Sequence, residues 1–129
     1  MAHLYIAPTP SSPEVDFQFD ALRLSLRGES YPENAAAFYG DIIARLKEFL
    51  AAQNGITLEV HIALAYFNSS STKMLFNLIE ALSNAAEDGS RVLLHWYHDA
   101  EDDTILEFGQ ELSEDFPALE FSTHAVGAA

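Results

Sequence analysis

The chain has 129 residues and a mass of 14.2 kDa, which is the size of one domain able to bury a hydrophobic core without disulfides. It has no cysteine, which excludes disulfides, a thiol nucleophile, iron–sulfur clusters and cysteine-based zinc fingers. Six basic and 20 acidic residues give a formal net charge of −14, which argues against nucleic acid and anionic membranes as partners. The sequence shows neither a signal peptide nor a membrane-spanning apolar run, so we expect a cytoplasmic protein.

The first part of the chain has the pattern of β-strands. A short β-prone run at 3–7 is followed by a proline-rich segment that excludes a central strand or a helix there. Apolar and polar residues alternate over 15–19 and again over 22–26, which predicts a hairpin with one buried face. We expect Gly28 to close the second strand of this hairpin.

The segment Ser-Tyr-Pro-Glu-Asn that follows has the features of a helix start. Ser30 with Glu33 three positions later fits a capping box, and Pro32 is tolerated in a first helical turn. Apolar residues at helical spacing then predict a helix over 33–53. Capping leaves Tyr31 and Asn34 unexplained, so we expect both to be exposed, with Tyr31 as the candidate interface aromatic.

The rest of the chain alternates strands with helices. Apolar residues on both faces of 57–67 predict a central strand that is covered on both sides. In strict alternation Tyr66 shares a face with Leu64, and Phe67 lies on the opposite face. The pattern further predicts helices at 71–87 and 103–113, a second buried strand at 91–97, and a last strand around 119–123.

This order predicts an α/β fold for residues 1–129 as a single domain. We expect a mixed sheet with an N-terminal hairpin, and parallel strands joined by right-handed crossover helices. The strands at 57–67 and 91–97 should be parallel neighbours. The size and order resemble STAS domains, which include the anti-sigma-factor antagonists, and residues 1–3 and 126–129 are expected to be frayed.

Four consecutive hydroxyl residues follow Asn68, between a buried strand and a helix: Ser69, Ser70, Ser71 and Thr72. Sites in open α/β sheets gather at the carboxyl ends of strands, and a helix N-terminus favours an anion. A phosphoryl group here would add about −1.5 to −2 charges. Helix capping is the simpler interpretation, but a cap needs only one such residue.

Other chemistry-bearing groups form no convincing site in the sequence. The acidic run at 99–103 lacks the calcium-loop pattern and suits the start of a helix. His95 and His98 should point to opposite faces of one strand, and the other histidines lie in separate predicted elements: His3, His61 and His124. The chain also lacks a P-loop, G-x-G-x-x-G and G-x-S-x-G. We therefore predict no catalytic residue, no metal site and no cofactor.

Three motifs resemble the SiaC family of regulatory phosphoproteins. They are Gly-Glu-Ser-Tyr-Pro-Glu-Asn at 28–34, Tyr-Phe-Asn-Ser-Ser-Ser-x-Lys at 66–73 and Trp-Tyr at 96–97, and the similarity extends from Ile6 to Phe121. The resemblance implies a non-catalytic phospho-switch in c-di-GMP and biofilm signalling. A protein kinase would phosphorylate it, a PP2C-type phosphatase would reverse this, and the unphosphorylated form would bind and activate a diguanylate cyclase.

The resemblance also carries over to single residues. Ser69 matches the phosphorylated position, where the best-known member has threonine, so Ser70, Ser71 and Thr72 stay as alternatives. We also expect the following residues to contact the partner protein: Tyr31, Pro32, Glu33, Asn34 and Asn68. Alternatives to the switch are a small hydrolase that uses the serine cluster and a scaffold subunit whose serines only cap a helix. An output protein other than a cyclase also stays open.

Overall fold

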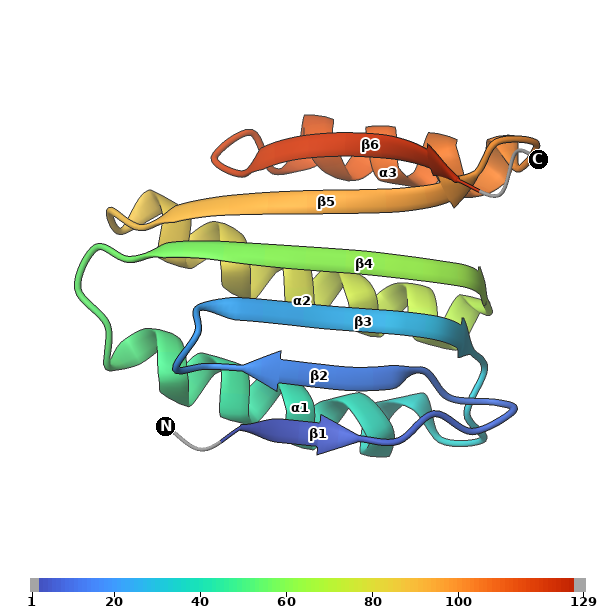
Figure 1. Cartoon of the computed structure of the whole chain (residues 1–129), viewed down its shortest axis with the longest axis horizontal. Helices are drawn as coiled ribbons and strands as arrows, with labels where there is room; N and C mark the ends of the chain where they lie inside the picture. The colour runs from blue at the N-terminus through green and yellow to red at the C-terminus, as the bar shows by residue number, and fades with distance from the viewer. Residues whose placement is uncertain (1–2, 127–129) are drawn as a thin grey trace.

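A computed structural model describes residues 3–126, which form six strands and three helices (Figure 1). Apart from His3 and Val126, the ends predicted to be frayed lie outside the described residues. The strands are β1 (Leu4–Ile6), β2 (Glu14–Gln18), β3 (Arg23–Ser30), β4 (Thr57–Phe67), β5 (Arg91–Asp99) and β6 (Glu120–Val126). The helices are α1 (Ala35–Ala51), α2 (Ser69–Glu87) and α3 (Asp103–Asp115).

The strands lie in the sheet in the same order as in the sequence, from β1 to β6. The pairs β1–β2 and β2–β3 are antiparallel, which confirms the predicted hairpin. The pairs β3–β4, β4–β5 and β5–β6 are parallel, which confirms the prediction for 57–67 and 91–97. The mixed α/β architecture predicted from the sequence is therefore correct.

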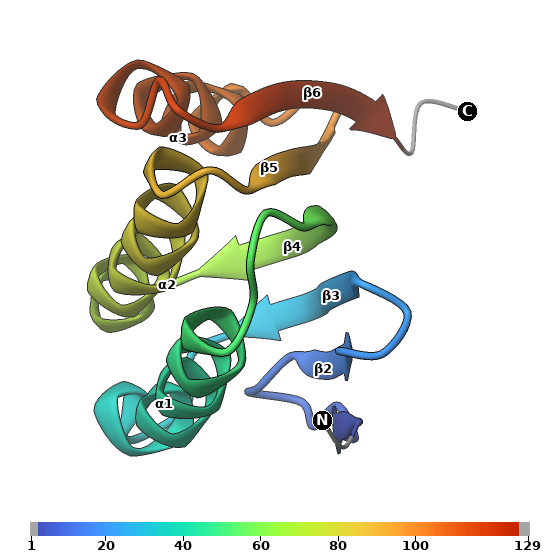
Figure 2. The same ribbon diagram turned by 90° about the vertical axis from the view of Figure 1, so that its left-hand side faces the viewer.

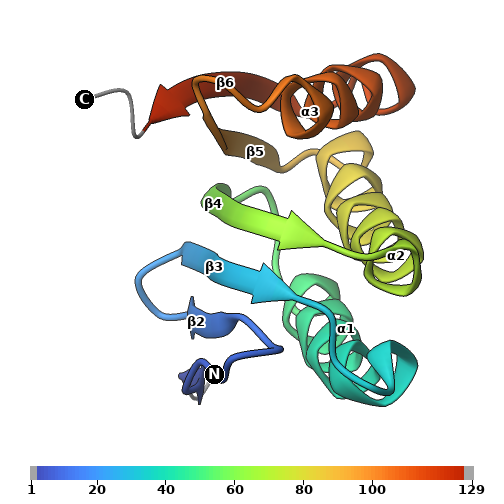
Figure 3. The same cartoon turned by 90° about the vertical axis from the view of Figure 1, so that its right-hand side faces the viewer.

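All three helices pack on one face of the sheet, as the two side views show (Figure 2, Figure 3). Each helix connects one strand to the next strand of the sheet, always in the same direction across the sheet. Because these crossover connections have the same handedness, all three helices lie on the same face. The prediction that 57–67 is covered on both sides was wrong. The side chains of Glu59, His61 and Ala63 are only half-buried, because they point to the open face.

The core lies between the sheet and the three helices. Its largest fully buried side chains include Trp96 from β5, Tyr39 from α1 and Phe17 from β2. The Trp96 indole donates a hydrogen bond to the Ile105 carbonyl (2.9 Å), so its polar atom is satisfied inside the core. Within residues 3–126, no helix is both long and apolar enough to cross a membrane.

A β-bulge near the end of β4 alters which side chains face the helices. Gly28 pairs with Leu64 whereas Glu29 pairs with Tyr66, so β4 carries one extra residue at this point. The extra residue reverses the alternation. Tyr66 is therefore 50% exposed, and Phe67 packs against the buried Trp96, contrary to the prediction for both residues.

Among the predicted boundaries that differ from the structure, two matter for the site. Strand β3 continues past Gly28 to Ser30, because Gly28 adopts a φ of 122° that lets the chain pass the bulge. The first helix begins at Ala35 and not at residue 33, because Asn34 is its N-cap. The Asn34 side chain accepts a hydrogen bond from the Ala37 N–H (3.0 Å).

Candidate functional site

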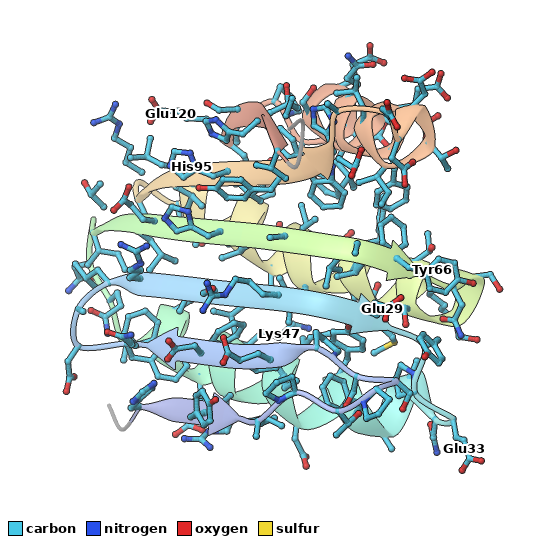
Figure 4. All side chains as sticks on the ribbon, turned by 45° about the vertical axis from the view of Figure 1, so that its right-hand side comes forward. Glu29, Glu33, Lys47, Tyr66, His95 and Glu120 are labelled. Carbon is cyan, nitrogen blue, oxygen red and sulfur yellow. The ribbon has the colours of Figure 1, made fainter. Side chains whose placement is uncertain are left out.

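The two motifs that the sequence singles out meet at the carboxyl ends of β3 and β4. Ser30 pairs with Phe67 at the last step of the ladder, and the Asn68 N–H donates to the Ser30 carbonyl (3.0 Å). Figure 4 shows the labelled Glu29 and Tyr66 close together at this end of the two strands. Parallel pairing therefore joins the Ser-Tyr-Pro-Glu-Asn segment to the serine cluster.

Buried hydroxyls connect β3, α1 and α2 beneath this end of the sheet. The Ser30 hydroxyl donates to the Ser71 hydroxyl (2.8 Å), which donates to the Ser30 carbonyl (3.0 Å). The Tyr39 hydroxyl lies 2.6 Å from the Ser30 oxygen and donates to it, since the Ser30 proton is already used. Burial raises the pKa of Tyr39 to about 12, and the Ser30 contact opposes that shift.

Ser30 is thus a buried strand residue, and the predicted capping box of Ser30 with Glu33 was wrong. The strand continues through Ser30, which leaves its side chain facing the helices and fully buried. Glu33 is exposed and Pro32 is half-buried, both in the short turn before α1. Asn34 is exposed as expected, and its capping role explains its presence.

Asn68 is the N-cap of α2, and this frees the serines after it from that role. The Asn68 side chain accepts a hydrogen bond from the Ser71 N–H (2.9 Å). Ser69 and Ser70 are exposed, and within residues 3–126 neither hydroxyl forms a hydrogen bond. Ser71 is fully buried, and the half-buried Thr72 donates to the Asn68 carbonyl (3.1 Å). Of the four hydroxyls, those of Ser69 and Ser70 are therefore the most accessible.

Two exposed aromatic rings lie at the same end of the sheet. Tyr31 is 40% exposed and Tyr66 is 50% exposed, and their rings meet edge to face with centroids 5.8 Å apart. Sequence reasoning singled out Tyr31 but missed Tyr66, because the strand at 57–67 was expected to be covered on both sides. Exposed tyrosine pairs of this kind are well suited to binding a protein partner.

The electrostatics of the site suit an added anion. Ser69 is the first residue of α2, where free N–H groups and the positive end of the helix dipole favour negative charge. The first turn of α2 contains no acidic residue. Lys73 is exposed four residues after Ser69, on the same face of the helix. These features favour an anion at the start of α2.

Within residues 3–126, the hydrogen bonds of the histidines do not involve the serine cluster. Four histidines find partners away from the serine cluster, since His3 contacts Asp16, His61 contacts Tyr97, and His95 contacts His124. His98 is buried beside the Asp99 carbonyl, on the face of β5 opposite to His95, as its spacing predicts. In the acidic run, the Asp102 side chain caps α3 by accepting from the Ile105 N–H (3.1 Å).

Comparison with known proteins identifies the family. The sequence profile of SiaC family regulatory phosphoproteins matches residues 6–126. The chain belongs to the SiaC family. A protein of Pseudomonas aeruginosa is 35% identical over 115 residues, which is 89% of this chain and 90% of that protein. Because the SiaC family is regulatory, this member is a regulatory protein and not a hydrolase.

Solved SiaC structures have the same fold as this family member. The crystal structure of apo-SiaC from P. aeruginosa superposes with a TM-score of 0.89 at 34% identity, covering 97% of this chain and all of that one. A second crystal structure shows P. aeruginosa SiaC in complex with the diguanylate cyclase SiaD, and SiaC is the activator of SiaD. Its SiaC chain superposes with a TM-score of 0.88 at 33% identity. That match covers 95% of this chain and 99% of SiaC.

Proposed function

We propose that this SiaC family protein is a cytoplasmic phospho-switch whose unphosphorylated form binds and activates a diguanylate cyclase. The observation that carries the proposal is the exposed Ser69 hydroxyl at the first position of α2, with the capping role already filled by Asn68. A protein kinase would phosphorylate Ser69, and a PP2C-type phosphatase would remove the phosphate. The cyclase is proposed because SiaC of P. aeruginosa is the activator of the diguanylate cyclase SiaD, and this relationship supports a role in c-di-GMP and biofilm signalling.

The docking surface of the proposal is the end of β3 and β4 together with the start of α2. We assign to it Tyr31 and Tyr66 as the aromatic contacts, and the exposed Ser69 at the start of α2. The other predicted contact residues border the same end of the sheet: Pro32, Glu33, Asn34 and Asn68. Asn34 and Asn68 fix the starts of α1 and α2, so their contribution to binding is mainly to position the backbone.

The switch follows from the charge that a phosphate brings to this surface. A dianion on Ser69 is stabilised in the free protein by the α2 N-terminus, to the extent of about 0.3–1 kcal/mol for an exposed anion. In the complex the same dianion must lose water or meet the groups of the partner, and both cost free energy. A penalty of about 3 kcal/mol would weaken binding more than a hundredfold.

Phosphopeptide mapping after treatment with the cognate kinase and ATP tests the assignment. We expect one phosphate on Ser69 in the unaltered protein and none in Ser69→Ala. Ser70→Ala is the matched control, because Ser70 is the equally exposed neighbour, and it should be phosphorylated fully. Full incorporation into Ser69→Ala would move the site to another hydroxyl, and no incorporation into the unaltered protein would overturn the switch.

A further inference from the structure

The open face of the sheet carries a cluster of ionisable side chains that the proposed switch does not use. Glu59 and His61 lie on β4, and His95 lies beside them on β5, where His61 and His95 pair in the parallel ladder. One potential ligand atom from each of the three lies within 4.8 Å of the others. The sequence analysis placed His61 and His95 in separate elements, and the parallel pairing of β4 with β5 brings the two side chains together.

The hydrogen bonds of the two imidazoles leave one nitrogen of each without a partner. The Nδ1 atom of His61 is 2.9 Å from the Tyr97 hydroxyl, and the Nδ1 atom of His95 is 3.0 Å from Nε2 of His124. Within the described residues, the Nε2 atoms of His61 and His95 are both buried and have no hydrogen-bond partner. A buried polar atom without a partner costs free energy, so such a pair of atoms calls for a ligand.

A hydrogen bond at Nδ1 is typical of histidines that bind metal through Nε2. When Nε2 is the ligand, Nδ1 keeps the proton and donates it to a neighbour, which fixes the orientation of the ring. Tyr97 and His124 are in place to accept those protons from His61 and His95.

The distances between the side-chain atoms of Glu59, His61 and His95 suit three ligands of one metal ion better than direct hydrogen bonds between these residues. Nε2 of His95 is 3.6 Å from the Glu59 carboxylate, which is too long for a hydrogen bond. Two ligand atoms at about 2.0–2.1 Å from a tetrahedral ion lie roughly 3.3 Å apart. The His61 and His95 rings are stacked with their centroids 4.6 Å apart, so both rings would turn about their side-chain bonds to direct Nε2 at one ion.

The geometry points to a binding site for one divalent transition-metal ion, of the zinc class, held by Glu59, His61 and His95. Two imidazoles and one carboxylate are a ligand set that zinc accepts, and water would fill the fourth position. The Glu59 side chain is 47% exposed and the His95 side chain is 24% exposed, so ions can reach the site from solvent. The ion would link the central strands β4 and β5 on the face that no helix covers, away from the Ser69 end of the sheet.

Titration of the chelator-treated full chain with Zn²⁺ tests this site, with calorimetry and thermal melting as readouts. We expect one saturable site, and a melting temperature that rises with Zn²⁺ because the ion binds the folded state. His95→Gln should weaken binding at least tenfold. Glu59→Gln should weaken it as well, and this change at an exposed position does not endanger the fold.

His3→Gln is the matched control, since it removes a histidine beside the edge strand β1, away from β4 and β5, and it should bind Zn²⁺ within twofold of the unaltered chain. Co²⁺ supplies a second readout, because a tetrahedral site gives strong visible absorption that should be lost in His95→Gln. The proposal is overturned if no 1:1 site saturates, or if His95→Gln and Glu59→Gln bind as tightly as the control. Because the test needs neither kinase nor cyclase, its outcome is independent of the proposed switch.

Discussion

The hydroxyls of Ser30, Tyr39 and Ser71 show how single residues hold the candidate site in place. They join the end of β3 to α1 and α2 inside the core, directly beneath the exposed start of α2. Each hydroxyl has a partner, so the group adds no unsatisfied polar atom to the core. The sequence predicts none of these contacts, because Ser30 and Ser71 both looked like surface residues at helix starts.

Alkaline pH tests the burial of Tyr39. The folded-state pKa of Tyr39 is about 12 against a reference value of 10.0, so the unfolded chain loses this proton first as the pH rises. The stabilisation is complete below pH 10 and is lost as the pH rises towards 12. Between pH 9 and 11 the free energy of unfolding should fall by about 1 kcal/mol more in the unaltered chain than in Tyr39→Phe. Urea unfolding measures this, and parallel pH dependences of the two proteins would contradict it.

Two helical glycines offer a matched test of core packing. A Cβ at Gly109 of α3 would lie 2.5 Å from the Trp96 ring, whereas a Cβ at Gly40 of α1 would meet nothing within 4 Å. Gly109→Ala should therefore lower the free energy of unfolding by about 1–3 kcal/mol through overpacking. Gly40→Ala should raise it by about 0.5–1 kcal/mol, because alanine favours the helix. Denaturant midpoints that move in the same direction for both variants would disprove this view of the core.

At the scale of elements, the starts of the helices decide which residues are structural and which are free to act. Asn68→Ala should lower the free energy of unfolding by about 0.5–2 kcal/mol, because the cap on the Ser71 N–H is lost. Ser69→Ala should change it by less than about 0.5 kcal/mol, because the Ser69 hydroxyl supports no contact. Thermal or urea unfolding of the two variants measures the difference. The reverse order would make Ser69 a structural cap and weaken its assignment as the switch.

The elements also show how far sequence patterns go. Alternation over 15–19 and 22–26 predicted the hairpin, and the order of strands and helices predicted the parallel section. The bulge in β4 was not predictable in this way, because one extra residue reverses the alternation without changing the composition of the strand. For that reason strict alternation placed Tyr66 and Phe67 each on the wrong face of the sheet.

At the scale of the whole molecule, the sequence predicted the site of the proposed switch but not the open face of the sheet. The motif at 28–34 and the serine cluster both follow strands, and parallel strands end at one edge, so their meeting could be expected. The open face was missed because half-buried residues such as Ala63 and Leu93 made β4 and β5 look covered on both sides. The row of His61, His95 and His124 emerges only once β4, β5 and β6 are known to be neighbours.

The most direct test of the switch compares two forms of this protein that differ by one phosphate. Phosphoserine can be incorporated at position 69 during synthesis, so the measurement does not depend on the kinase. Binding to the diguanylate cyclase and the rate of c-di-GMP production are then measured for both forms. Phosphoserine at the exposed Ser122 of β6 is the control for added charge, and it should leave the affinity within about twofold.

We expect the unmodified chain to bind and activate the cyclase. The chain phosphorylated at Ser69 should bind more than about a hundredfold more weakly, which corresponds to a loss of roughly 3 kcal/mol. Its melting temperature should stay close to that of the unmodified chain, because the α2 N-terminus tolerates the added anion. Equal affinities of the two forms for the cyclase, with both folded, would contradict the switch.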